Sequence, residues 1–205
     1  MKCFKLFIIS FIILTFSCTK DENVSTIDYS SGLFVVNEGP FGNGTGTVTF
    51  QHGGDTLQDI FARENPGKVL GNIAQSMIKF KDKFFISINN GAKIQVVNAK
   101  DFKSLGEING INVPRYFAAD QNKLYISNWG PDFNSGAVYE INPETMTLSK
   151  PISIGGAPEN MIIHQDKLYV AVSSSSAQNK SNKVVVIDTK TNLILKTIFV
   201  GDSPE

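Results

Sequence analysis

A repeated unit of short strands is the feature that most constrains how this chain can fold. In its clearest copy, residues 168–172, 184–187 and 193–200 are three runs rich in β-branched and apolar side chains. Residues 188–192, between the last two runs, read Asp-Thr-Lys-Thr-Asn and have the composition of a turn. This pattern predicts antiparallel strands joined by tight turns. Three such strands cannot bury both of their faces alone, so the unit needs neighbours of its own kind.

The chain supplies those neighbours. Pro114, Pro158 and Pro204 open successive units at intervals of 44 and 46 residues. Runs of matching composition recur in each unit, and strands are expected at residues 76–80, 84–88, 94–97, 116–119, 124–127, 138–141, 160–163, 168–172 and 184–187. Four short strands in about 45 residues are typical of one blade of a β-propeller. We therefore predict an all-β fold, a β-propeller of four-stranded antiparallel blades.

The last unit carries a family resemblance. Its LYVAV segment and the following KVVVIDTKTNLILKTIFVGDSPE are similar to the YVTN-type repeat of YncE-like propellers. The resemblance is close over residues 168–205 and looser in the two units before them. It implies a ring that usually has seven blades. Because propellers host many activities, the resemblance specifies the fold more than the function.

The propeller is predicted to span residues 32–205, which leaves room for about four blades. We place them at residues 32–70, 71–110, 111–156 and 157–202. Residues 33–39 match residues 124–130 position by position, so the first blade begins with its second strand and lacks an inner one. Its third and fourth strands are expected at residues 47–51 and 57–62. The sequence thus predicts an open, incomplete part of a seven-bladed ring.

The first 18 residues resemble a bacterial lipoprotein signal peptide. Lys2 and Lys5 precede an apolar run at residues 6–16, which is too short to span a bilayer, since about 20 residues are needed. Ser17 then precedes Cys18, which the resemblance makes the lipidated first residue of the mature protein. An ordinary secretory signal that is cut nearby is the alternative interpretation.

Residues 19–31 are expected to be a flexible leader between the lipid and the propeller. Their Lys20-Asp21-Glu22 segment resembles the surface-export signal of Bacteroidota lipoproteins. The expected location is therefore the outer membrane, exposed at the cell surface and attached through the lipid only. An acidic pair that merely keeps the tether solvated is the alternative.

Composition excludes several classes of function. Lysine and arginine together number 19, as do aspartate and glutamate, and neither sign is concentrated in runs, which argues against nucleic-acid binding through a basic surface. Cys3 and Cys18 are the only cysteines, so the mature domain has no internal disulfide. His52 and His164 stand alone without a cysteine partner, and we assign neither a metal nor a cofactor.

A candidate ligand face lies where the second strand of each blade ends. Asn37-Glu38-Gly39, Asn89-Asn90-Gly91 and Asn128-Trp129-Gly130 follow these strands, beside the links that carry Gln75 and other polar residues. The candidate ligand-binding residues are Asn37, Glu38, Asn89, Asn90, Arg115, Tyr116, Asn128, Trp129, Glu159 and Asn160. Amides with aromatic rings suit a neutral, hydrogen-bonding ligand that has flat or sugar-like parts. The alternative is that asparagine and glycine serve only the turns, which favour them.

Three classes of function remain open from the sequence. The first is a surface binding module that captures a small-molecule nutrient or a partner protein for an outer-membrane transporter. Cobalamin-capturing lipoproteins are among the Bacteroidota propellers that this chain resembles, so a corrinoid is one possible ligand. The second is a scaffold or adhesion propeller. The third is an enzyme of the lactonase or quinoprotein type, for which we assign no catalytic residue. We favour the binding module.

Overall fold

The computed structural model describes residues 27–174, 176–178 and 180–205, so Cys18 and most of the predicted leader lie outside it. The described chain forms sixteen strands and one short helix. They are β1 (Leu33–Asn37), β2 (Thr47–His52), β3 (Asp55–Leu57), α1 (Ile60–Glu64), β4 (Ala74–Phe80), β5 (Lys83–Ile88), β6 (Lys93–Asn98), β7 (Ser104–Ile108), β8 (Pro114–Ala119), β9 (Leu124–Asn128), β10 (Ala137–Asn142), β11 (Thr147–Leu148), β12 (Ile152–Ser153), β13 (Ala157–His164), β14 (Lys167–Ser173), β15 (Lys183–Asp188) and β16 (Ile194–Phe199).

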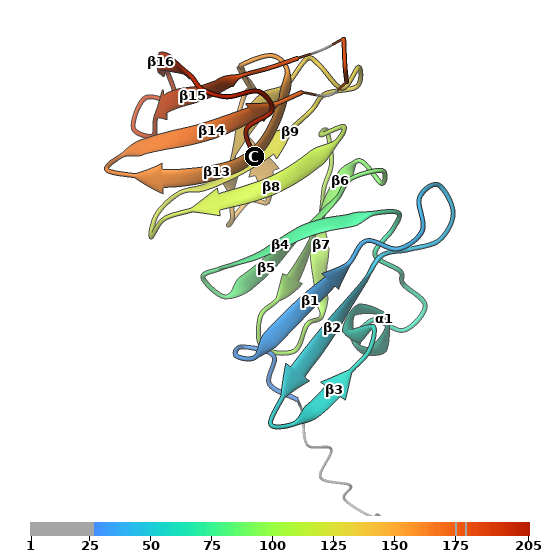
Figure 1. Ribbon diagram of the computed structural model, residues 1–205. Coiled ribbons are helices and arrows are strands. Elements are labelled where there is room, and N and C mark those ends of the chain that lie inside the picture. The colour runs from blue at the N-terminus through green and yellow to red at the C-terminus, as the bar shows by residue number, and fades with distance from the viewer. Residues whose placement is uncertain (1–26, 175, 179) are drawn as a thin grey trace, which may run out of the picture.

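These strands make four antiparallel sheets that follow one another along the chain. The first sheet contains β1–β3, the second β4–β7 and the fourth β13–β16, each in sequence order. The third runs β8–β9–β10, and β10 pairs with both β11 and β12, two halves of an interrupted outer strand. Figure 1 shows the sheets stacked face to face as an open arc. The predicted all-β fold of antiparallel blades is confirmed.

The first strands of neighbouring blades lie next to each other. β4 contacts β8, and β8 contacts β13, while β1 approaches β4 from the first sheet. The strands that begin the blades therefore line the inner edge of the arc. In the first sheet β1 pairs only with β2, and no described strand occupies the position inside it. This agrees with the prediction that the first blade starts at its second strand.

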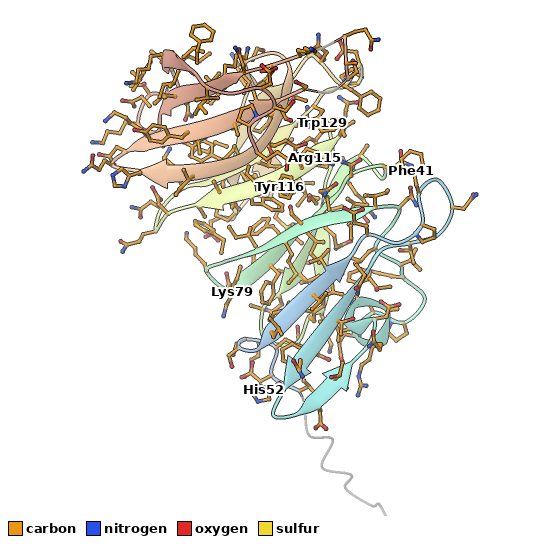
Figure 2. The ribbon with its side chains drawn as sticks, in the orientation of Figure 1. Phe41, His52, Lys79, Arg115, Tyr116 and Trp129 are labelled. Atoms are coloured by element: carbon orange, nitrogen blue, oxygen red, sulfur yellow. The ribbon has the colours of Figure 1, made fainter. Side chains whose placement is uncertain are left out.

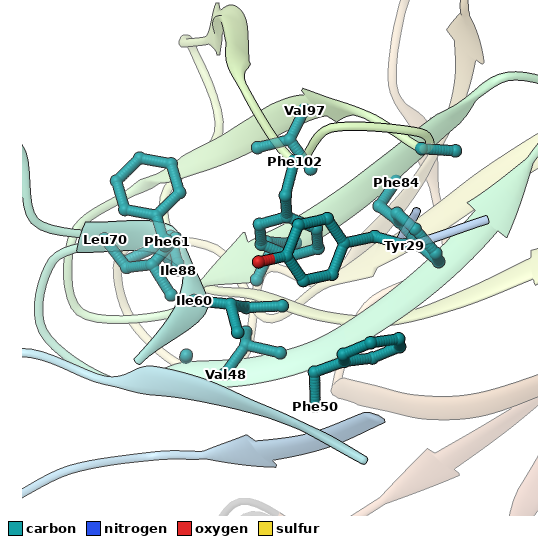
Figure 3. Packing of buried hydrophobic residues seen from close by; sticks show 13 residues of the cluster. Tyr29, Val48, Phe50, Ile60, Phe61, Leu70, Phe84, Ile88, Val97 and Phe102 are labelled. Carbon is teal, nitrogen blue, oxygen red and sulfur yellow. The ribbon is translucent and has the colours of Figure 1, made fainter. Parts of the chain in front are cut away.

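Apolar side chains fill the spaces between sheets. Three clusters of buried residues lie between the first and second, second and third, and third and fourth sheets. Figure 3 shows the first of these clusters. In it the ring centroid of Tyr29 lies 4.9 Å from that of Phe50 and 5.6 Å from that of Phe102. Successive residues of a strand point to opposite faces, so Phe84 joins this cluster and Phe85 joins the next. Each central sheet is thus buried on both faces.

The fourth strand of the first blade differs from its prediction. It was expected at residues 57–62, but β3 ends at Leu57 and helix α1 follows from Ile60 to Glu64. The Asp59 side chain caps this helix by accepting a hydrogen bond from the amide of Ala62 at 3.3 Å. Ile60 and Phe61 are buried in the first cluster, so the helix closes the outer part of this blade. The strand prediction was wrong because it treated an apolar pair as an alternating run.

No helix among the described residues is long and apolar enough to span a membrane.

Candidate functional site

The site begins with an irregularity that the blades share. The pairing of the first strand with the second shifts register after Ala74 in β4, after Pro114 in β8 and after Pro158 in β13. Gln75, Arg115 and Glu159 follow these three residues directly and lie within the irregular segments. A bulge bends its strand and redirects the side chain that it carries. The three polar side chains therefore occur at one level of the arc, in three successive blades.

Serine hydroxyls support two of these bulges. Ser87 Oγ accepts a hydrogen bond from the amide of Ser76 at 3.1 Å, and Ser127 Oγ accepts one from the amide of Tyr116 at 3.0 Å. Both serines are buried on the neighbouring second strand. They satisfy amides that the shifted strand ladder leaves without a backbone partner, which stabilises the irregular geometry.

The redirected side chains bind one another across the blades. Arg115 donates from Nε to Glu159 Oε2 at 3.1 Å and from Nη2 to Glu159 Oε1 at 3.0 Å, a two-pronged ion pair. Its Nη1 donates to Gln75 Oε1 at 2.5 Å. Gln75 Nε2 in turn donates to Glu38 Oε1 at 3.1 Å and to the Tyr116 hydroxyl at 3.2 Å. One polar network thus connects all four sheets at their inner edge.

Burial of Glu159 sets its electrostatics. The residue is 5% exposed, and burial raises the pKa of its carboxyl above the ordinary value, while the hydrogen bond and positive charge of Arg115 oppose that rise. The pKa remains raised, so burial outweighs the opposing effect of Arg115. Without Arg115 this carboxylate would be buried and uncompensated.

Aromatic rings enclose the Arg115 guanidinium. Its carbon lies 4.3 Å from the ring centroid of Trp129 and 5.4 Å from that of Tyr116, within the range of a cation–π interaction. Phe133 meets Trp129 edge-on, with centroids 6.0 Å apart and planes at 78°. Trp129 Nε1 is buried and makes no hydrogen bond of acceptable geometry among the described residues. Its N–H is nevertheless near enough to the Glu159 carboxyl to lower the pKa of that group.

A pocket opens above this network, and we call it the interloop pocket. The loop after β5 has only four residues, 89–92, whereas the loops on either side of it, 38–46 and 129–136, have nine and eight. The two longer loops carry Phe41 and Phe133, which are 82% and 51% exposed. The open cavity has a volume of about 350 Å³ and is lined by Glu38, Phe41, Ile73, Gln75, Asn89, Val113, Arg115, Tyr116, Trp129 and Phe133. Figure 2 shows Phe41, Arg115 and Trp129 toward the same side of the arc.

Glycines keep the two longer loops narrow at their base. Gly39 and Gly130 have φ of 78° and 80°, a left-handed conformation that favours glycine. A Cβ on Gly39 would lie 2.4 Å from the Thr45 carbonyl oxygen, and one on Gly130 would lie 2.3 Å from Ser135 Oγ. These glycines let each loop fold back on itself, so the aromatic residues are held at the rim of the pocket.

Half of the predicted ligand-binding residues meet in this pocket. They are Glu38, Asn89, Arg115, Tyr116 and Trp129. Glu159 lies behind it and contacts Arg115.

Two of the other candidates hold strands and links together. Asn37 Nδ2 donates to the hydroxyls of Thr47 and Thr49, both at 3.1 Å, and Asn128 Oδ1 accepts from the amides of Asn112 and Val113 at 3.2 and 3.0 Å. Asn37 thus connects β1 to β2, and Asn128 holds the link that precedes β8.

Two further candidates also lie outside the pocket lining. Asn90 donates to Asn72 Oδ1 at 2.8 Å at the surface. Asn160 lines a separate depression on the outer face of the fourth sheet.

Sequence reasoning missed the apolar wall of the pocket, which Ile73 and Val113 form. Ile73 has φ of 61°, a strained conformation for a β-branched residue. Its carbonyl accepts a hydrogen bond from the Asn89 amide at 2.8 Å, which ties the link before β4 to the short loop. Each residue immediately precedes the first strand of its blade, β4 or β8. This place in the repeat is the signal by which the sequence could have indicated them.

In the described parts of the chain, no three histidine, cysteine, aspartate or glutamate side chains group as a metal site would require. The residues that line the interloop pocket offer hydrogen bonds, aromatic contact and charge. Such a pocket can hold a small molecule between its two rims.

Solved structures similar to this chain share the propeller architecture. A quinoprotein alcohol dehydrogenase-like protein from Bacteroides thetaiotaomicron matches with a TM-score of 0.60 and 15% identity over 84% of this chain and 41% of its own. The dihydro-heme d1 dehydrogenase NirN matches with a TM-score of 0.56 and 12% identity over 78% and 34%. AztD from Citrobacter koseri gives 0.54 and 15% over 78% and 43%. These likenesses show the fold, and the chain spans less than half the length of each.

None of the curated proteins compared with the sequence matches it. A family model does match, over residues 31–203, and it covers all four sheets. The chain therefore belongs to the DUF5074 family, which is described as a domain of unknown function.

Proposed function

We propose that this protein is a binding module that holds a small molecule in the interloop pocket. The observation that carries the proposal is the convergence of side chains from three blades on one cavity of about 350 Å³. A pocket in which exposed aromatic rings surround a fixed polar network has the composition of a ligand site. The hydrogen-bonded network fixes the side chains of the pocket floor, which lowers the entropic cost of binding.

The exposed aromatic residues support binding over a purely structural role. Phe41 is 82% exposed, and among the described residues its ring has no aromatic partner within stacking distance. Phe133 touches Trp129 but leaves half of its surface in solvent. Keeping two phenylalanines at the rims of one pocket contributes little to folding, because each leaves half or more of its surface in water. A ligand with a flat or ring-shaped part would cover both.

We further propose that the module is a lipid-anchored protein of the bacterial surface that passes a nutrient to an outer-membrane transporter. The leader through Cys18 and the resemblance to YncE-like repeats of Bacteroidota surface lipoproteins support this context. A corrinoid is one nutrient of the expected kind. Replacing Cys18 with Ser should release the protein from the membrane fraction, because the acyl group that would anchor the mature chain is then missing. A Cys18→Ser protein that stays in the membrane fraction would contradict the lipid anchor.

Ligand binding is tested with the fluorescence of Trp129, the single tryptophan of the chain. Small nutrients that do not absorb the exciting or emitted light of tryptophan are titrated by fluorescence. Cyanocobalamin absorbs that light and is titrated by calorimetry. We expect at least one compound to bind saturably. A Phe41→Ala/Phe133→Ala variant should weaken it tenfold or more, as expected for loss of aromatic anchors.

Phe199→Ala is the matched control, since Phe199 is 77% exposed on β16 and does not line the pocket. It should leave the affinity unchanged. Absence of any saturable ligand, or equal affinity in the double variant, would contradict the proposal.

A further inference from the structure

We infer that the interloop pocket selects a ligand that carries a protonated amine beside a flat apolar group. The inference rests on the proposed function and adds the charge of the ligand to it. The sequence suggested a neutral ligand, because the candidate face offers amides and aromatic rings. The arrangement of the charges in the folded protein favours a cation.

Arg115 does not make the pocket positive. Its guanidinium donates twice to the Glu159 carboxylate, at 3.1 and 3.0 Å, and once to Gln75 at 2.5 Å. A two-pronged pair of this kind neutralises the arginine at short range. Glu205 also lies close enough to Glu159 to raise its pKa by charge repulsion, so a further negative charge lies near the pair.

Glu38 is the remaining charge on the pocket wall. It is exposed, and its described polar contact is with the neutral amide of Gln75 at 3.1 Å. Apart from Arg115, the residues that line the pocket include no lysine, arginine or histidine. Glu38 and Arg115 of the lining, together with Glu159 directly behind it, have a net charge of about −1 at neutral pH. An anionic ligand would meet like charge, whereas a cation would be attracted.

The rims of the pocket add a second attraction for a cation. The face of an aromatic ring is electron-rich and attracts ammonium groups, and several rings around one site strengthen that preference. Trp129 already shows this behaviour toward Arg115, whose guanidinium carbon lies 4.3 Å from the ring centroid. No described lysine or arginine lies over Phe41 or Phe133, so these rings remain available to a ligand. The same rings would pack against the flat part of the molecule.

Three probes with one skeleton test the charge preference. Tryptamine, tryptophol and indole-3-propionate each carry an indole and a two-carbon chain that ends in an ammonium, a hydroxyl and a carboxylate. Calorimetry with the full chain should give tryptamine at least tenfold tighter binding than tryptophol, with indole-3-propionate the weakest. Raising the salt from about 0.1 to about 1 M should weaken tryptamine and leave tryptophol unchanged, because salt screens exposed charges.

Glu38→Gln removes the charge and keeps an oxygen that can accept the Gln75 hydrogen bond. This variant should bind tryptamine about tenfold more weakly and tryptophol within twofold of the parent protein. The control is Glu144→Gln, since Glu144 is an exposed glutamate that lines a different depression, and it should change neither affinity. Melting curves of both variants should coincide with that of the parent.

The outcomes separate this inference from the proposed function. Equal affinities for the three probes, or tryptamine binding that Glu38→Gln leaves intact, would overturn the charge preference while binding in the pocket stands. Failure of all three probes to bind overturns the inference as well. The proposed function then stands or fails with the Phe41→Ala/Phe133→Ala experiment, which does not depend on these probes.

Discussion

Tyr125 and Tyr169 hold the same position in two neighbouring sheets but have different surroundings. Each is the second residue after the lysine that opens its motif, Lys-Leu-Tyr. Tyr125 is fully buried between the third and fourth sheets, and its hydroxyl lies 2.9 Å from Asn192 Oδ1. Tyr169 is half-buried on the outer face of the fourth sheet, where it lines an open depression. A residue of the repeat is therefore buried only where a neighbouring sheet covers it.

The first sheet, at the opposite end of the arc, shows the same dependence of burial on a neighbouring sheet. Leu124 and Ile126 of β9 are fully buried against the second sheet, whereas their counterparts Leu33 and Val35 of β1 are 59% and 48% exposed. The side chains are as apolar at the ends as in the middle. Exposure thus depends on stacking, and stability in such an array comes mainly from contacts between nearest neighbours.

Replacing each tyrosine by alanine gives the largest expected contrast. Tyr125→Ala should lower the free energy of unfolding by about 3–5 kcal/mol, because it removes a buried ring and leaves a cavity. Tyr169→Ala should cost about 1 kcal/mol or less, since the ring is partly solvated already. Denaturant unfolding of both variants measures the difference. Equal losses would mean that the outer face of the fourth sheet is covered in solution.

Arg115→Ala should produce the next largest effect. It leaves the buried carboxylate of Glu159 unpaired, and we expect a loss of about 2–3 kcal/mol, below the value for a fully buried pair because Arg115 is partly solvated. Lys81→Ala, which breaks the exposed pair with Glu144, should cost less than about 1 kcal/mol. Adding Glu159→Gln to Arg115→Ala should restore part of the loss, which a simple packing defect would not allow.

The stability of the Arg115→Ala variant should also depend on pH. The pKa of Glu159 is raised by burial, so the folded state holds its proton more tightly than the unfolded state does. A raised carboxyl pKa stabilises the fold below the unfolded pKa, and this contribution is lost as the pH rises through the folded pKa. Because Arg115 opposes the rise, Arg115→Ala should push the pKa higher. Its stability should then fall more steeply than that of the parent between about pH 4 and 7.

Amide exchange should sharpen the comparison between the middle and the ends of the arc. β9 is paired on both edges, by β8 and β10, whereas β1 pairs only with β2 and β16 only with β15 among the described strands. We expect the amides of β1 and β16 to exchange at least tenfold faster than those of β9, because edge strands open locally at lower cost. Exchange measured by mass spectrometry at neutral pH tests this. Uniform protection across the three strands would refute it.

The sequence predicted the repeat and much of the pocket for a physical reason. Strand periodicity and turn chemistry are local, so they placed Arg115, Tyr116 and Trp129 at the ends of neighbouring strands. The register shift after Pro114 is not local. It depends on the pairing of β8 with β9, and only the assembled sheets bring Arg115 into contact with Glu159 and Gln75.

One local signal was present and was not used. Asp59 precedes the apolar pair Ile60 and Phe61, and Pro66-Gly67 follows shortly after. A capping residue before a short apolar segment and a helix-ending pair behind it indicate a helix. The prediction of a strand at residues 57–62 gave more weight to the place of this segment in the repeat, where the other blades have their outermost strand. In the first blade α1 lies there instead.

The smallest effect is expected in the loop that carries Phe133. Asp132 Oδ1 accepts hydrogen bonds from the Ser135 hydroxyl and the Ser135 amide, both at 2.6 Å, and from the Asn134 amide at 3.0 Å. These bonds, led by that from the hydroxyl, lower the pKa of Asp132 to about 2. A lowered carboxyl pKa stabilises the loop above the unfolded value of 3.8, and the contribution disappears as the pH falls toward 2.

Ser135→Ala removes the strongest of these bonds, so the pKa of Asp132 should rise toward its ordinary value, as followed by NMR of its carboxyl carbon. Thr191→Ala removes a longer hydroxyl bond, of 3.1 Å, to Asp188 in the fourth sheet and should raise the Asp188 pKa slightly without moving that of Asp132. Affinity for a pocket ligand should fall less than threefold in Ser135→Ala, because the two backbone bonds still hold the loop. A larger fall would mean that the hydroxyl, and not the backbone of the loop, fixes Phe133 at the rim of the interloop pocket.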